Sequence, residues 1–178
     1  MNLPEYPHAY FGRLTLALDD IIWAEKNCAE LIAVNPGAPF STQRTVAVAL
    51  TTALVVSYGR IFESSRTARP EEEVAVANAF GELKGKVIRE YQRRSLNSTH
   101  IRMIDLRNKV FAHSDASKRN YSFTSTIGIP YGRNPMTPLH IAELGQVQSI
   151  LQVVGSKVGA EQNRVRRKLF PESFKAGE

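Results

Sequence analysis

The stretch VAVALTTALVV, residues 46 to 56, decides the fold class of this chain of 178 residues, because an apolar run of this kind fits either a buried strand or a helix. Taken alone, the overlapping stretch TVAVAL would fit a strand. The whole segment, from Ser41 to about Ser65, is too long for one strand, and Ser41 is a good N-cap residue. Its larger apolar residues recur at helical spacing: Val46, Leu50, Leu54, Tyr58 and Ile61. The sequence therefore predicts a helix here.

Helical patterns cover most of the remaining chain. Turn and capping signals separate them, such as Asn35-Pro36-Gly37 and the three glutamates after Pro70. Residues 116–138 are rich in Ser, Thr, Gly and Pro, which indicates an irregular loop or a short hairpin. The expected fold is all-α, a bundle of four to five helices in a single domain over 1–178 with short tails at about 1–8 and 171–178. The other predicted helices are about Ala9 to Val34, Pro70 to near Arg94, Asn97 or Ser98 to between His113 and Asp115, and Pro138 to Leu169.

The positive charge of the chain is concentrated in one part of the sequence. The net charge is +6, yet the window from Lys84 to Arg119 alone holds ten basic residues against Glu90, Asp105 and Asp115. Such a concentration of cations suits a polyanionic partner. Solvated helix faces and cations at helix ends are the alternative explanation.

Composition and motifs argue against several classes of protein. Cys28 is the single cysteine, which excludes an internal disulfide framework and a multi-cysteine zinc site. No cofactor and no metal are expected. The run at 46–56 is too short to cross a membrane and contains two threonines. The N-terminal residues lack the pattern of a secretion signal, so we expect a cytoplasmic protein that does not associate with membranes.

The stretch LRNKVFAHSD, residues 106 to 115, places an arginine on the apolar side of a predicted helix. At about 100° per residue, Arg107 falls in the middle of the apolar arc, and Asp105 points about 160° away from it. Burying an arginine unpaired costs several kcal/mol, on the order of a lost buried ion pair, so Arg107 needs a partner. The candidates are an acid on another helix, such as Glu63 or Glu82, a second chain, or a bound phosphate. The arc comprises Met103, Ile104, Leu106, Val110 and Phe111, and the opposite side holds Arg102, Asp105, Lys109 and His113.

Arg107 and His113, with five residues between them, resemble the R-x(4-6)-H motif of the HEPN superfamily. Members of this superfamily are helical bundles that include RNA-cleaving toxins and abortive-infection proteins. Asn108 follows the arginine directly, as is common in the family, and YGRIF at 58–62 resembles a tract in related members. The resemblance implies a metal-independent endoribonuclease of toxin or antiviral defence type, which leaves a 2′,3′-cyclic phosphate and a 5′-hydroxyl. Arg107, His113 and Asn108 would be its catalytic residues.

The chemistry of RNA gives each of these side chains a role. The 2′-hydroxyl is an internal nucleophile beside the phosphate, and an imidazole can exchange protons with it or with the leaving oxygen near neutral pH. A guanidinium can stabilise the charge that builds on the phosphate. Six residues of helix separate Arg107 and His113 by about 9 Å along the axis and roughly 120° around it. We therefore expect a homodimer in which two copies of the motif line one cleft, as in HEPN proteins.

Other residues have less specific roles. Asn108 could orient the phosphate or simply be exposed. HEPN toxins that a nucleotidyltransferase antitoxin modifies often have a tyrosine where this chain has Asp115, so we do not expect modification at that position. Modification of Tyr121 and an antitoxin that covers the cleft are the alternatives. Trp23 and Phe62 are expected in the core. The candidate RNA-binding residues are Arg102, Lys109, Lys118, Arg119 and Arg60, although Glu63 offers Arg60 an ordinary ion pair.

The competing hypothesis is a non-catalytic HEPN-like bundle that binds RNA or another protein. In that case Arg107 and His113 would only stabilise the dimer, because a fold can be kept after its chemistry is lost. The nuclease hypothesis would fail if an internal carboxylate locked the guanidinium of Arg107, or if Arg107 and His113 faced separate solvent surfaces.

Overall fold

The computed structural model describes residues 3–34, 41–63, 69–114, 122–123, 130–131 and 139–171, with the backbone alone for 109–114 and for the two short strands. This part of the chain is an all-α bundle with one small antiparallel hairpin, which confirms the predicted fold class. The stretch VAVALTTALVV is helical. The elements are α1 (Pro7–Ala33), α2 (Thr42–Ile61), α3 (Pro70–Arg93), α4 (Asn97–Ser114), β1 (Ser122–Phe123), β2 (Pro130–Tyr131) and α5 (Ile141–Leu169).

Helix ends follow the capping residues of the sequence. The side chain of Ser41 accepts a hydrogen bond from the backbone N–H of Arg44 at 3.1 Å, as expected of an N-cap. At α5 the Nδ1 of His140 accepts from the N–H of Ala142 at 3.3 Å, and Glu143 accepts from the N–H of His140 at 2.9 Å. Because this reciprocal cap fixes the first turn, α5 begins at Ile141 and not at Pro138 as predicted.

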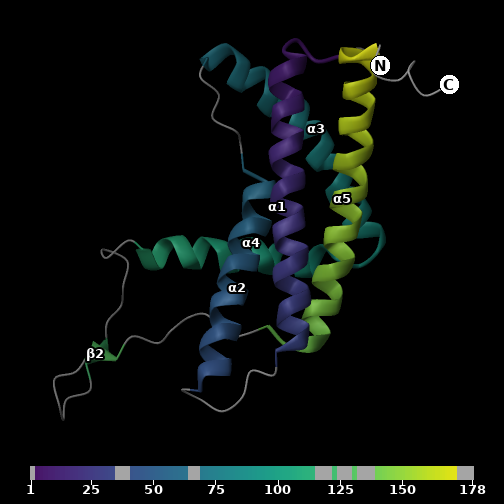
Figure 1. The fold of residues 1–178 in the computed structure, drawn as a ribbon. Helices are drawn as coiled ribbons and strands as arrows, with labels where there is room; N and C mark the ends of the chain where they lie inside the picture. Colours follow the sequence, from purple (N-terminus) through teal and green to yellow (C-terminus); the bar gives the residue numbers. More distant parts are fainter. Residues whose placement is uncertain are drawn as a thin grey trace.

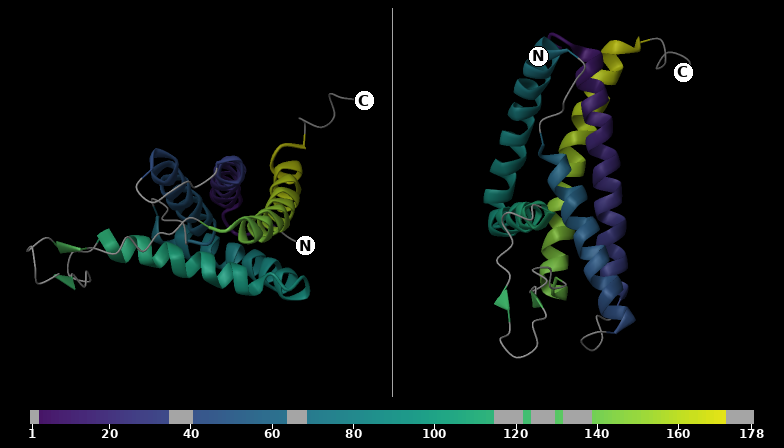
Figure 2. Two further views of the ribbon diagram at one scale, coloured as in Figure 1. Left: turned by 90° about the horizontal axis from the view of Figure 1, so that it is seen from below. Right: turned by 90° about the vertical axis from the view of Figure 1, so that its left-hand side faces the viewer.

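The long helices α1, α2 and α5 run lengthwise, with α1 between the other two, and α4 crosses them (Figure 1). Seen from below and from the side, α3 and α4 lie against one face of this layer (Figure 2). The C-terminal end of α4 projects beyond α2 in both figures. The helix that carries the predicted motif therefore leaves the bundle after it has crossed α2.

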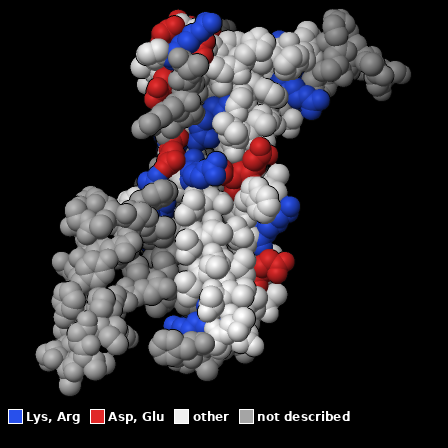
Figure 3. Space-filling view, turned by 60° about the vertical axis from the view of Figure 1, so that its left-hand side comes forward, with Lys and Arg blue, Asp and Glu red and all other residues white. Residues whose placement is uncertain are grey.

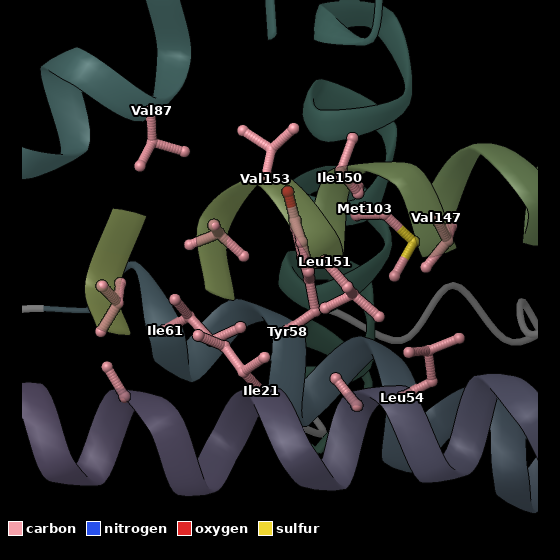
Figure 4. Packing of buried hydrophobic residues seen from close by; sticks show 14 of the residues in the cluster. Ile21, Leu54, Tyr58, Ile61, Val87, Met103, Val147, Ile150, Leu151 and Val153 are labelled. Atoms are coloured by element: carbon pink, nitrogen blue, oxygen red, sulfur yellow. The ribbon is translucent and has the colours of Figure 1, made fainter. Parts of the chain in front are cut away.

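Helices α1, α2, α3, α4 and α5 each contribute buried side chains to one core (Figure 4). Ile21 of α1, Tyr58 of α2, Met103 of α4 and Leu151 of α5 are at most 3% exposed. Burying each such side chain contributes roughly 1.5 to 3 kcal/mol. Helix α4 packs against α2 and also contacts α3 and α5, and these contacts hold it across the bundle.

The prediction that Trp23 is a core residue is wrong. Its side chain is 59% exposed, and the ammonium of Lys26 lies 5.1 Å from the ring centroid. Trp23 lies about 200° around α1 from the buried Ile21, so its side chain points away from the core. Phe62 is partly buried and packs against the core. Among the described residues no helix combines the length and the apolar character needed to traverse a lipid bilayer.

A buried histidine joins α4 to α2. His100 is 9% exposed, and its Nδ1 lies 2.6 Å from the hydroxyl of Tyr58. The rings of Phe62 and Tyr91 pack against the imidazole with centroids 4.8 and 5.3 Å away. Burial lowers the pKa of His100, so the neutral form is the one that fits this site.

We predict that the stability of the protein falls when the pH drops below neutral because of His100. The unfolded chain binds a proton near the reference pKa of about 6.5, whereas the folded chain binds it only at lower pH. The free energy of unfolding is therefore highest above that value and decreases until the folded pKa is reached. Urea denaturation at about pH 7.5 and about pH 5.5 should show a smaller loss for His100→Gln than for the wild type.

His100→Gln keeps a hydrogen-bond acceptor for Tyr58 and cannot titrate in this range. His8 and His140 are present in both proteins, so their contribution cancels in the comparison. An equal loss of stability in the two proteins would contradict the assignment to His100.

Candidate functional site

Arg107 lies on the side of α4 that faces the bundle, as its position in the apolar arc predicted. Its side chain is 23% exposed. Met103, one turn earlier, is buried, while Arg102 and Asp105 are exposed. Its aliphatic stem lies beside Gly59 of α2, so the arginine belongs to the α2–α4 contact and is partly buried there.

The guanidinium of Arg107 is held by a carboxylate from α2's end. Its Nη2 pairs with Oε1 of Glu63, and its Nη1 donates to Oδ1 of Asn108 at 3.2 Å. Of the partners considered from the sequence, the structure thus contains an acid from the neighbouring helix, Glu63 and not Glu82. The side chain of Glu63 is 42% exposed, so this ion pair is open to solvent on one side.

The end of α2 also attracts cations from two other helices. The last carbonyls of a helix have no partner within it and carry partial negative charge. Nη2 of Arg13 donates to the carbonyls of Arg60, Ile61 and Glu63 at 3.2, 2.8 and 2.9 Å. Nζ of Lys84 donates to the carbonyl of Phe62. Side chains from α1 and α3 therefore cap the C-terminus of α2.

Arg13 itself is buried, with 6% exposed. Its guanidinium carbon lies 4.1 Å from the ring centroid of Phe80, which gives the cation a second favourable contact. Burial lowers the pKa of Arg13, and burial together with the charge of Arg13 lowers that of Lys84. Both groups stay cationic near neutral pH, because arginine is effectively always protonated and the ordinary pKa of lysine is far above 7.

Arg60 has a different partner from the one considered in the sequence. Its Nε lies 3.4 Å from Oδ1 of Asp20, and not beside Glu63. Asp20 is 7% exposed, and its burial raises the pKa of the carboxyl although Arg60 and Arg13 oppose this. The side chain of Arg60 remains 57% exposed. Arg60 is thus a surface cation whose Nε pairs with Asp20.

We call these six charged residues at the end of α2 the α2 terminal cluster: Arg13, Asp20, Arg60, Glu63, Lys84 and Arg107. It contains four cations and two carboxylates and therefore has an excess of positive charge. On the face drawn in Figure 3, Lys and Arg side chains gather at mid-height with Asp and Glu among them. A mostly uncharged surface lies below them.

Gly59 lets Arg107 pass close to the backbone of α2. A Cβ atom at Gly59 would lie 2.5 Å from Cγ and 3.0 Å from Cδ of Arg107. Only glycine leaves room for the aliphatic part of this arginine on its way to Glu63. Sequence analysis noted the YGRIF tract but did not predict this role.

The predicted site residues fall into three groups. Arg107, Asn108 and Arg60 lie at the end of α2, while Arg102 lies elsewhere on α4 and pairs with Glu143 of α5 at 2.8 Å. His113 belongs to the last turn of α4, and its side chain, like that of Lys109, lies outside the described part. Lys118 and Arg119 also fall outside the described residues.

Arg13, Asp20 and Lys84 belong to the cluster but were not predicted as site residues. For Arg13 and Asp20 a signal was available, because both stand near the apolar stripe of α1 that contains Tyr10, Leu14, Ala17 and Ile21. The argument that identified Arg107, a cation on an apolar helix face, applies to Arg13 without change. Among the described residues no group of three or more His, Cys, Asp or Glu side chains could hold a metal ion.

Comparison of the chain with protein-family models, with curated proteins and with solved structures gives no match.

We predict that Gly59→Ala destabilises the protein by roughly 1 to 3 kcal/mol, the usual cost of overpacking. The new methyl group would collide with the side chain of Arg107. Arg107→Ala removes the atoms at 2.5 and 3.0 Å, so the double variant should recover most of the loss. Chemical denaturation of the four proteins of this double-mutant cycle measures the coupling.

Gly81→Ala on α3 is the matched control, because nothing lies within 4 Å of its added Cβ. It should stabilise the helix by about 0.5 to 1 kcal/mol. Additive effects of Gly59→Ala and Arg107→Ala would show that the side chain of Arg107 does not pass beside position 59 as described.

We predict that Arg13→Met lowers the free energy of unfolding by roughly 2 to 4 kcal/mol, because three carbonyl groups at the end of α2 lose a charged donor. Arg89→Met, which removes an exposed cation from α3, should change it by less than about 0.5 kcal/mol. Urea denaturation at neutral pH provides the measurement. Equal effects of the two substitutions would refute the capping role of Arg13.

Proposed function

We propose that this chain is a metal-independent endoribonuclease of HEPN toxin or abortive-infection type. The observation that carries the proposal is the position of Arg107. It is partly exposed within a cluster that has an excess of positive charge, on the helix whose last turn contains His113, six residues further along. The helical-bundle fold agrees with the resemblance of the motif.

Each side chain of the motif has a defined task in the proposed reaction. His113 removes the proton of the 2′-hydroxyl or protonates the leaving 5′-oxygen. The 2′-oxygen attacks the phosphorus, the bond to the 5′-oxygen breaks, and a 2′,3′-cyclic phosphate and a 5′-hydroxyl result. Arg107 donates to the phosphate oxygens as their charge increases, and Asn108 holds one Nη of Arg107 in place.

The active form in this proposal is a homodimer. Within one chain the backbone positions of Arg107 and His113 are separated by about 9 Å along α4 and roughly 120° around it. A second copy facing the projecting end of α4 would bring one His113 toward the other copy's Arg107. RNA would enter the cleft between the copies, with Arg60 and Lys109 beside its backbone, and an antitoxin protein could inhibit the enzyme by covering that cleft.

The ion pair with Glu63 favours a second candidate function, a non-catalytic module that binds RNA or a protein. A carboxylate of the same chain already satisfies Arg107, which is what a purely structural role requires. The exposure of Glu63 weakens this second candidate. Exposed ion pairs contribute only about 0 to 1 kcal/mol, so the carboxylate can leave Arg107 at little cost.

We predict that His113→Ala reduces RNA cleavage by about 10²- to 10⁴-fold, the usual contribution of general acid-base catalysis. Arg107→Ala should cause a comparable loss, and a chelator should cause none. The assay follows cleavage of a single-stranded RNA and identifies the cyclic phosphate at the product end. RNA binding by His113→Ala, measured by fluorescence anisotropy, should remain.

His8→Ala, an exposed histidine on α1, is the control for general effects of removing an imidazole. Cleavage that is equal in the wild type and in His113→Ala would support the binding module instead. Sedimentation at micromolar concentration tests the dimer, and a purely monomeric protein would contradict the composite site.

A further inference from the structure

We infer that Glu63 occupies, on Arg107, the place of the substrate phosphate, and that RNA binds by displacing this carboxylate. Glu63 would therefore be a built-in competitor that weakens the binding of RNA to the site. This inference rests on the proposed function in assigning RNA as the ligand.

The first argument is chemical similarity. A guanidinium presents the same pair of donors to a carboxylate and to a phosphate. Nη2 of Arg107 faces Oε1 of Glu63, and Nη1 is fixed by Asn108 at 3.2 Å. Oε1 of Glu63 thus stands where an anionic phosphate oxygen would bind to Nη2.

The second argument is that the pair can open. The side chains of Glu63 and Arg107 are 42% and 23% exposed, so the carboxylate can rotate into water and recover its hydration. Glu63 also lies beyond the last residue of α2. In contrast, Asp20 is 7% exposed, and it cannot leave Arg60 for solvent as easily.

The third argument is electrostatic. When Glu63 leaves, the α2 terminal cluster keeps its four cations and loses one of its two carboxylates. Arg13 and Lys84 remain tied to the carbonyl groups of α2, so they hold the end of the helix in place while Arg107 changes its partner. A phosphate that arrives at Arg107 would compensate the increase in positive charge.

The test is the affinity for a 2′-O-methyl RNA oligonucleotide, which cannot be cleaved by attack of the 2′-oxygen. Glu63→Gln should bind it about three- to tenfold more tightly than the wild type, which corresponds to about 0.65 to 1.4 kcal/mol for the removal of a competing ion pair. Fluorescence anisotropy at fixed, moderate salt gives the dissociation constants.

Glu90→Gln is the matched control. It removes the same charge from a carboxylate that pairs with Arg93 and Arg94 on α3. The gain in affinity should be larger for Glu63→Gln than for Glu90→Gln, and it should disappear when Arg107→Ala is added. Glu63→Asp keeps the net charge but shortens the side chain, and it should have an intermediate affinity even if Glu63→Gln folds poorly.

Equal affinities of Glu63→Gln and Glu90→Gln, with Glu63→Asp equal to the wild type, would overturn the inference. This outcome is independent of cleavage. If the wild type cleaves RNA through Arg107 while the two Gln variants bind alike, the competitor role fails and the nuclease stands. If no cleavage occurs but Glu63→Gln binds more tightly, the competitor role stands and the nuclease fails.

Discussion

The structure depends on how the C-terminus of α2 is satisfied inside the bundle. A helix end that stops between other helices leaves carbonyl groups that water reaches poorly. Arg13 and Lys84 supply donors from α1 and α3, and Arg107 of α4 joins them through Glu63. Helices α1, α3 and α4 thereby all contact the C-terminal end of α2. The same requirement that stabilises the fold also concentrates cations at one place on the surface.

Much of the fold could be predicted from the sequence, because helical periodicity and capping residues are local properties. Ser41 and Pro70 mark helix starts in the sequence as they do in the structure. Trp23 lies outside the core because its position on α1, about 200° from Ile21, turns the side chain toward solvent. The position of Arg107 facing the bundle was predicted from angles, but the choice of Glu63 over Glu82 was not, since it depends on how α4 crosses α2.

The cations of the candidate site differ in how firmly the protein binds them. Arg13 is buried, stacked on Phe80 and bonded to three carbonyls, so it serves as a fixed element. Arg107 and Arg60 are partly exposed and each pairs with one acid. In the proposed function, Arg13 holds the end of α2 in place, and Arg107 and Arg60 are the cations that meet the anion. His100, buried against Tyr58, adds rigidity to the same α2–α4 contact.

The missing side chain at Gly59 has a consequence for sequence variation. Because the stem of Arg107 occupies the space beside it, the two positions form one steric unit. A lineage that exchanged the arginine for a short residue would be released from the requirement for glycine, whereas one that kept the arginine would not. The pair Gly59 and Arg107, forty-eight positions apart, is thus a joint signature by which distant versions of this chain could be recognised.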